Sequence, residues 1–519
     1  MAIHPPFPKS ALDRLKAIVH SRLFQRSIIA SIAGLALLLG AADALARVGG
    51  GHSYSGSSSS GGGGGDGDGA GALASLLIRL LLWLCIEHPL FGIPITIVVV
   101  LGFVKMNHST KVQQQQGWAT GAVRAQNTHQ DRAAMLRAKF KRLRAIDPAF
   151  SRVLFEDFVY FLYAQMQRTR AKPAASMAAY VAPGLLASRH EPSIKDVTGI
   201  VIGAMRIQDI HGLGGQRIAI DLRIESNVVE VLAESGAEQR FYLVERLRLM
   251  RDASAKSRPA ARAQVLDCPN CGAPFDAIRG TTCSYCQQDL GHGRFDWQVT
   301  QWMTDRRERR GPLLTETVAE TGTELATLRA PDAQRGFAAL IERDPALNWD
   351  TFARRIRDIW GNLQSGWSER DLAKIRPFVS DNLFQSMVYW IDLYVAQKCR
   401  NVTESGQIQK LVLADVSSDE TYDAVTVRLF ATGLDYTISD DGKLLSGSKS
   451  RPRPYSEYWT LIRGHACQGK SKDWTKCPNC GAELSVSMTG NCDYCQAKVT
   501  SGDFDWVLSR IEQDESYGG

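Results

Sequence analysis

Asp147-Pro148-Ala149-Phe150 and Asp344-Pro345-Ala346-Leu347 are two versions of one short sequence, and each precedes a helical pattern. An Asp-Pro pair is a helix-start signal, so we expect a helix to begin at each of them. Apolar residues follow at helical spacing, at Phe155, Phe158, Phe161, Leu162 and Met166 in the first copy and at Phe352, Ile356, Ile359, Trp360, Leu363 and Trp367 in the second. Each copy therefore predicts an amphipathic helix whose aromatic side faces a protein core.

Both helical patterns are followed by stretches in which apolar and polar residues alternate, as they do in β-strands. These stretches cover residues 217–224 in the first copy and 422–430 in the second. A further matching strand is predicted at 245–251 and at 457–463, where alternate residues share one face. Helices followed by several antiparallel strands predict an α+β fold, present here as two tandem copies.

Eight of the eleven cysteines form two copies of one pattern, in which two C-x2-C pairs lie at identical spacing. Four thiolates so placed are typical of a closed tetrahedral zinc site, which is structural rather than catalytic. Disulfide bonds or a redox C-x-x-C are the alternatives, and a cytoplasmic location disfavours disulfides. The predicted ligands of two structural zinc ions are Cys268, Cys271, Cys283 and Cys286 in the first ribbon and Cys477, Cys480, Cys492 and Cys495 in the second.

Each cysteine pattern continues, without a change of spacing, into a Phe-Asp-Trp sequence. The aromatic residues are Phe295 and Trp297 after the first ribbon, and Phe504 and Trp506 after the second. We expect these aromatic side chains to pack each ribbon onto its own module.

The first hundred residues predict a membrane anchor. An apolar run over 27–46 is either a cleaved signal peptide or a retained transmembrane helix, and both remain possible. A Gly/Ser-rich linker follows at 47–71, and a transmembrane segment is predicted within 72–104. Because Lys and Arg flank the apolar segments on both outer sides, residues 105–519 are expected on the cytoplasmic side.

The net charge of +7 is concentrated beside these apolar segments. Residues 105–146 carry nine Lys and Arg side chains and one Asp, while 147–519 hold a slight excess of acidic residues. This distribution argues against broad binding of nucleic-acid phosphates by the domains. The basic neck includes a predicted helix with Met135, Leu136, Phe140 and Leu143 on one side. It either lies on anionic lipid or forms a solvated linker helix.

The second copy resembles the Tim44-like domain family, which is named for an adaptor of mitochondrial protein import and also occurs in bacterial membrane proteins. The resemblance rests on Phe352, on Leu363-Gln364-Ser365-Gly366-Trp367, on Asp371-Leu372, on Ile375-Arg376-Pro377-Phe378, on Ser380-Asp381 and on Glu457-Tyr458-Trp459-Thr460-Leu461-Ile462-Arg463. The linker at 47–53 is similar to bacterial members. The resemblance implies a cone-shaped fold of the nuclear-transport-factor-two type and membrane-associated tethering of other proteins without catalysis. The first copy lacks the Leu-Gln-x-x-Trp and Asp-Leu patterns.

The leading hypothesis is a non-enzymatic scaffold, anchored in a bacterial inner membrane, that binds membrane or membrane-proximal proteins, or lipid. The alternative is a membrane protein that contacts ribosomes or nucleic acid through its ribbons and basic neck. An enzyme is disfavoured because His190, His292 and His465 have no evident carboxylate partner and His211 lies in a predicted turn. The predicted segments are 1–46, 47–71, 72–104, the neck at 105–146, domain 1 at 147–262, ribbon 1 at 263–300, a linker helix at 301–340, domain 2 at 341–470, ribbon 2 at 471–510 and a tail at 511–519.

Overall fold

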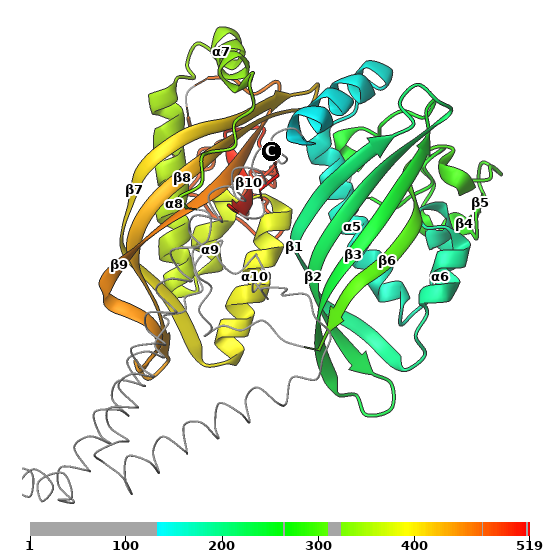
Figure 1. Ribbon diagram of the computed structural model, residues 1–519, viewed down its shortest axis with the longest axis horizontal. Helices are drawn as coiled ribbons and strands as arrows, with labels where there is room; N and C mark the ends of the chain where they lie inside the picture. Colours follow the sequence, from blue (N-terminus) through cyan, green and yellow to red (C-terminus); the bar gives the residue numbers. More distant parts are fainter. Residues whose placement is uncertain (1–131, 263–264, 310–322, 470, 515–516, 519) are drawn as a thin grey trace, which may run out of the picture. The chain divides into compact units, whose positions relative to one another are not determined.

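The structure, a computed structural model, describes residues 132–519 except 263–264, 310–322, 470, 515–516 and 519 (Figure 1). The predicted signal peptide or first span, the Gly/Ser linker, the segment 72–104 and the neck up to residue 131 lie outside the described residues. In the part that is described, no helix combines the length and the apolar character needed to cross a bilayer. The described chain is a mixed α/β protein with two four-stranded antiparallel sheets.

The first module, residues 132–309, has a sheet in the order β1-β2-β3-β6. Figure 1 shows its long, twisted strands. Its elements are a helix over 132–146, α5 (Arg152–Thr169), η1 (Ala175–Ala179), α6 (Pro183–Arg189), β1 (Ile194–His211), β2 (Arg217–Leu232), β3 (Glu238–Asp252), η2 (Ala260–Arg262), η3 (Phe275–Ala277), β4 (Ile278–Arg279), β5 (Thr282–Cys283), η4 (Gly291–Gly293) and β6 (Gln298–Glu308).

The second module, residues 323–518, has a sheet in the order β10-β9-β8-β7. Helices α8, α9 and α10 lie on one side of this curved sheet (Figure 1). Its elements are α7 (Ala333–Arg343), α8 (Trp349–Glu369), α9 (Leu372–Ile375), η5 (Arg376–Phe378), α10 (Asp381–Ala396), β7 (Cys399–Ser418), β8 (Tyr422–Ser439), β9 (Leu444–Gly464) and β10 (Val507–Gln513).

The two long helices do not begin at the Asp-Pro pairs, so that prediction was wrong. Helix α5 begins after Ser151, whose side chain accepts a hydrogen bond from Leu154 N, and α8 begins after Asn348, which forms a capping box with Thr351. Side-chain oxygens at these positions satisfy N–H groups that the first helical turn leaves without a partner. Asp147 and Asp344 have another role, because each binds a buried arginine of its own module.

The predicted aromatic stripes and strand faces are in the cores. Phe155 and Phe352 are at most 4% exposed, and Trp459 is fully buried on β9. Leu247 and Leu249 on β3 are buried on the same side, as the alternation of the sequence predicted. The apolar residues of each helix thus face the sheet that follows it in the sequence, except Phe161, which is half-buried and outside the core.

The helix over 132–146 is part of the first module's core. Phe140 and Leu143 are buried, and Phe140 stacks on Phe150 with a ring-centroid distance of 6.1 Å. Met135, expected on the same side, is 63% exposed. Because the apolar side of this helix is covered by protein, it is neither a separate solvated linker nor free to insert that side into lipid.

Two predicted boundaries differ from the structure. Residues 301–308, expected to belong to a linker helix, form most of β6, because they pair with β3 and complete the sheet. The predicted tail at 511–519 is also part of the module: β10 continues to Gln513, and Tyr517 stacks on Tyr458 with ring centroids 3.8 Å apart. Both segments gain backbone hydrogen bonds or aromatic contacts with residues distant in the sequence.

Candidate metal centres and the modules that hold them

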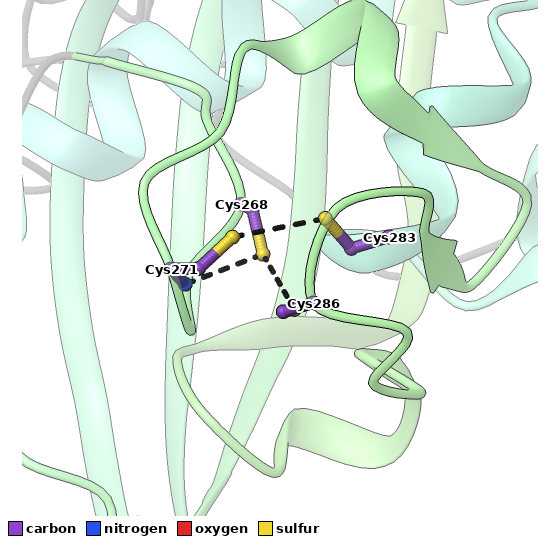
Figure 2. A group of neighbouring side chains, drawn as sticks. All are labelled: Cys268, Cys271, Cys283 and Cys286. Atoms are coloured by element: carbon purple, nitrogen blue, oxygen red, sulfur yellow. Dashed lines mark hydrogen bonds between the residues drawn. The ribbon is translucent and has the colours of Figure 1, made fainter.

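The eight predicted ligands come together in two groups of four. Figure 2 shows Cys268, Cys271, Cys283 and Cys286 turning their side chains toward one another from two adjacent loops. The Sγ atoms of Cys268 and Cys286 are 3.8 Å apart, as are those of Cys271 and Cys283. Tetrahedral zinc with Zn–S bonds of about 2.3 Å requires sulfur–sulfur distances of about 3.8 Å. The four thiols therefore fit a tetrahedral metal ion.

The second cysteine cluster has the same geometry. Its Sγ–Sγ distances are 3.8 Å between Cys477 and Cys495 and 4.0 Å between Cys480 and Cys492. Within each cluster all four sulfur atoms lie within 4.8 Å of one another. No disulfide joins any of the cysteines that the structure describes. Both clusters thus offer four thiols to one ion each, with no protein ligand of another kind.

The backbone of each cluster turns sharply after the cysteine pairs. Gly272 and Gly481, each directly after a first C-x2-C pair, have φ angles of +77° and +74°. A glycine adopts this left-handed conformation without the steric cost that a Cβ adds. Gln287 and Gln496 have similar positive φ angles after the second pairs. The repeated turns place both cysteines of every pair on the same side of the loop.

Hydrogen bonds make some of these thiols more acidic than others. The Asn270 amide lowers the pKa of Cys286 to about 6, and the Asn479 amide, 3.4 Å from Cys495 Sγ, lowers the pKa of Cys495 to about 6. Burial acts in the other direction and raises the pKa of Cys268 to about 12. A bound cation would favour the thiolate at all four positions, because metal ligation requires deprotonated sulfur.

Each cysteine cluster lies between two paired strands of its module. The first is inserted between β3 and β6, and the second between β9 and β10. The strand after the cluster returns to pair with the strand before it. Each cluster is therefore an insertion within a sheet, and its loops connect the third and fourth strands.

The Phe-Asp-Trp sequences carry the tryptophans that anchor these returning strands. Trp297 and Trp506 are 3% and 2% exposed. Trp297 meets Phe155 edge to face at 5.3 Å, and Trp506 meets Phe352 at 5.1 Å. The prediction that these residues pack against the modules is confirmed for both tryptophans.

A buried arginine lies over each of these indole rings and was missed by the sequence analysis. The guanidinium groups of Arg251 and Arg463 each lie 4.6 Å from the centroid of their tryptophan. Arg251 pairs with Asp147, and Arg463 pairs with Asp344, each at 2.8 Å with both side chains buried. The sequence contained one signal for these ion pairs, namely that an Asp and an Arg recur at matching positions in both modules.

Further contacts fix each cluster to its module. In the first module, the Tyr180 hydroxyl donates to the Asp267 carbonyl, just before Cys268, and Arg262 pairs with the Asp267 carboxylate at 2.8 Å. In the second module, Arg376 donates from Nε to the Met488 carbonyl at 2.9 Å, and Lys498 pairs with Asp381 at 2.7 Å. Arg376 and Asp381 belong to the stretch that carries the family resemblance, and both contact the second cluster or its loops.

The first module also holds a buried carboxylate that has four neutral donors and one arginine, Arg189, whose Nη1 atom is 3.9 Å away. Glu245 is 2% exposed and accepts hydrogen bonds from Tyr163, Gln167, Trp302 and Thr304 at 2.6–2.9 Å. This carboxylate raises the pKa of Tyr163, in addition to the larger effect of burial. The site is filled by its own side chains, so the arrangement stabilises the fold.

Two histidines have carboxylate neighbours that the sequence did not reveal. His211 Nε2 lies 2.9 Å from Asp221, and His465 Nδ1 lies 3.2 Å from Asp423. The prediction that His465 has no carboxylate partner was therefore wrong. Its partner is on β8, more than forty positions earlier in the chain, and strand pairing brings the two residues together.

Comparison with curated proteins found no match to this sequence. The comparison with protein families found a match within the second module. Residues 333–475, from the start of α7 to the approach to the second cysteine cluster, match the family model of the Tim44-like domain.

Proposed function

We propose that this chain is a non-enzymatic, membrane-anchored scaffold that binds other membrane or membrane-proximal proteins at the cytoplasmic face of a bacterial inner membrane. The observation that carries the proposal is the match of residues 333–475 to the Tim44-like domain, a domain of membrane-associated protein-binding proteins. The N-terminal sequence supports the anchor through its two apolar segments and the basic residues that flank them.

The first module is proposed to be a second copy of the same domain. Its support is structural, because both modules place a cysteine cluster between the third and fourth strands of an antiparallel sheet. Both also contain the Asp–Arg pair over a buried tryptophan. Such a combination of distant contacts is a stronger mark of common architecture than the short sequence matches.

The metal in both clusters is proposed to be zinc, with a structural role. Four thiolates are soft ligands, and a tetrahedral set of four sulfurs is typical of zinc. A closed site of this kind has no open position for a substrate or water. Its effect would be to hold the loop between two strands, and hence the pairing of β6 with β3 in the first module and of β10 with β9 in the second.

Anionic lipid is proposed as a further partner of the basic neck. Within the described part of the neck, Lys141 and Arg142 are exposed, whereas Lys139 pairs with Asp209. Basic side chains near an anionic membrane contribute about 1 kcal/mol each. Because the apolar side of this helix is covered, we expect the contact to be electrostatic.

The test is crosslinking in native membranes, followed by purification through an affinity tag at the carboxyl terminus and mass spectrometry. We expect a small, reproducible set of membrane proteins, which is lost when Cys477 and Cys480 are both replaced by serine. Cys467→Ser is the matched control, because this half-buried thiol lies outside both clusters. Recovery of no membrane protein above an untagged control would refute the scaffold proposal.

A second candidate function is contact with ribosomes or nucleic acid. It is favoured by Tyr285 and Tyr494, which occupy the same position in both clusters and are 72% and 63% exposed. Exposed aromatic rings can stack on unpaired bases. Co-purification of ribosomal proteins or RNA, with binding that weakens steeply with salt and is lost in Tyr285→Ala/Tyr494→Ala, would favour this function over the first.

A further inference from the structure

One face of the first module's sheet packs on α5, and the other face carries polar side chains. Ile220, Leu222 and Ile224 of β2 lie in the core together with residues of α5. Because successive side chains of a strand point to opposite faces, Asp221 and Arg223 lie on the face away from α5. The sheet therefore has a core face and an outer face, and the outer face is charged along the middle of β2.

Three arginines lie next to one another across this outer face. Arg223 of β2 pairs directly with Arg206 of β1 on one side and with Arg246 of β3 on the other. The row ends at Met303 of β6, which pairs with Arg246. The side chain of Arg246 is 54% exposed and Met303 is 50% exposed, so solvent reaches this row. Together with Arg248, on the same side of β3, these residues form what we call the arginine face.

Carboxylates compensate most of the charge of the arginine face. Arg223, Arg246 and Arg248 each pair with one carboxylate at 2.6–2.9 Å. Their partners are Glu225, Asp305 and Asp221, respectively. With Arg206, four arginines meet three carboxylates, so the face keeps one positive charge. Like charges directly opposite each other destabilise a sheet, and an anionic partner would reduce that repulsion.

The second module has an arginine at the place of Arg223. Arg428 is this counterpart, because each of the two arginines pairs with the residue directly after a matching glutamate of the next strand. These glutamates are Glu245 and Glu457. The Arg428 side chain is only 1% exposed, whereas that of Arg223 is 36% exposed. The same place in the sheet is therefore covered in the second module and accessible in the first.

Two segments of the chain cover Arg428, and both contact it through oxygen atoms. Its Nη1 donates to a backbone carbonyl of the segment 325–328 at 2.6 Å, and its Nε lies 2.9 Å from the carboxylate of Asp514. Tyr458, which pairs with Arg428, stacks on Tyr517 and accepts from a backbone N–H of the same segment at 2.9 Å. The second module thus binds polypeptide of its own chain on this face, with a carboxylate on the arginine and an aromatic ring beside it.

The two positions that flank the shared arginine differ between the modules. In the first module they are Arg206 and Arg246. In the second module they are Val412 and Tyr458. An arginine can replace the tyrosine as a stacking partner, because a guanidinium is attracted to the face of an aromatic ring. It also binds carboxylates through paired N–H donors. The first module can therefore hold an aromatic side chain as well, and it has two more cations for acidic ones.

We propose that the arginine face binds an acidic segment of another protein. Carboxylates of that segment lie on the arginines, and an aromatic side chain stacks on Arg246, as Tyr517 stacks on Tyr458 in the second module. The proposal rests on the proposed scaffold function, to which it adds the surface that is used and the chemistry of the bound segment. It places this contact in the first module, whereas the family match lies in the second.

The test titrates the full chain, in a zwitterionic detergent, against a fluorescein-labelled peptide of sequence Asp-Glu-Asp-Glu-Ser-Tyr, and follows binding by fluorescence anisotropy. The peptide Asn-Gln-Asn-Gln-Ser-Tyr has the same length and the same ring but no acidic side chain. We expect it to bind at least about tenfold more weakly, a difference of about 1.4 kcal/mol. Added salt should weaken binding of the acidic peptide, because ions screen charges on an exposed face.

Two variants change the arginine face itself. Arg206→Gln/Arg246→Gln removes two of its cations and should weaken binding of the acidic peptide at least about tenfold. Met303→Glu adds a negative charge at an exposed position of the same row and should also weaken it. Arg223 is left in place, because it pairs with the buried Glu225.

Lys141→Gln/Arg142→Gln is the matched control. It also removes two exposed cations, but they belong to the basic neck. We expect this variant to bind the acidic peptide as the unchanged chain does. Circular dichroism should show the same fold for all variants.

Three results would overturn the proposal. The first is equal binding of the uncharged peptide. The second is an unchanged affinity in both Arg206→Gln/Arg246→Gln and Met303→Glu. The third is a loss of binding in the neck variant alone, which would place the peptide on the neck.

The titration and the crosslinking experiment fail separately. If crosslinking recovers membrane proteins and the peptide does not bind, the scaffold role stands and this site is wrong. If the peptide binds with the expected pattern and no partner is recovered, the site stands and the scaffold role is wrong.

Discussion

Replacement of Asp344 by alanine is expected to destabilise the second module more than any exposed substitution. The Asp344 carboxylate accepts from Arg463 at 2.8 Å and from the Gly469 backbone N–H at 3.1 Å. Both charged side chains are buried, with 2% and 3% of their surface exposed. In the described part of the chain, Arg463 Nε and Nη2 make no hydrogen bond, so Asp344 is its one hydrogen-bonded carboxylate.

The size of the expected loss of stability follows from the charge of Arg463, which would remain buried without its partner. Removal of one member of a buried ion pair costs about 3–5 kcal/mol, because the other charge stays buried without compensation. The cation–π contact of Arg463 with Trp506 at 4.6 Å offsets part of that cost. For a module of this size, about 4 kcal/mol corresponds to a decrease in Tm of roughly 10 °C.

The assay is thermal unfolding of the full chain in detergent, followed by tryptophan fluorescence. Asp358→Ala, at an exposed position on α8, is the control and should change the free energy of unfolding by less than about 0.5 kcal/mol. The double variant Asp344→Ala/Arg463→Met should be more stable than Asp344→Ala alone, since it removes the uncompensated charge. Asp147→Ala should have a similar effect on the first module, because Asp147 pairs with the fully buried Arg251.

Two outcomes would refute this reasoning. One is a Tm for Asp344→Ala within error of the Asp358→Ala control. The other is a double variant whose loss of stability equals the sum of the two single losses, because strict additivity means that the residues do not interact.

Three further predictions concern the cysteine clusters and the helix α8. Cys480→Ser should reduce the metal content from two ions to one per chain, as measured by elemental analysis. An unchanged metal content would show that the second cysteine cluster is not a metal site. Arg376→Gln should speed metal release to a chelator from one of the two sites, because Arg376 holds the Met488 carbonyl, whereas the exposed Arg354→Gln should not. Gly366→Ala should lower stability by about 1–3 kcal/mol, since its Cβ would lie 2.6 Å from Ile375, while Gly361→Ala should raise it by about 0.5–1 kcal/mol. Equal Tm values for the two glycine variants would contradict the close packing of α8.

The two groups of four cysteines that could hold a metal ion were predicted from the sequence, because the evidence for them is local. A C-x2-C pair brings two thiols together within a single turn, and the structure adds only the meeting of two such pairs. The helical and strand patterns predicted the buried faces equally well. Burial of one face of a helix requires apolar residues at helical spacing, as at Phe352, Ile356 and Ile359. The Tim44-like resemblance of the second copy depended on the same residues and is confirmed over 333–475.

Predictions failed where a residue's role depends on a distant partner. Asp147 and Asp344 have the sequence appearance of helix starts, and the competing interaction with Arg251 and Arg463 is invisible without the paired strands. Residues 301–308 have no strong strand alternation, and pairing with β3 determines their conformation. Tertiary hydrogen bonds outweigh weak local propensity in both cases.

The sequence by itself determined the mixture of helices and strands, the two groups of four cysteines and most of the apolar residues of the cores, because each leaves a short-range pattern of spacing or composition. Only the tertiary structure decided that each cluster lies between paired strands and that an arginine lies on each anchoring tryptophan. These features depend on the register of strands more than a hundred residues away from α5 or α8. Register is set by packing across the whole module, and no local stretch of sequence contains that information.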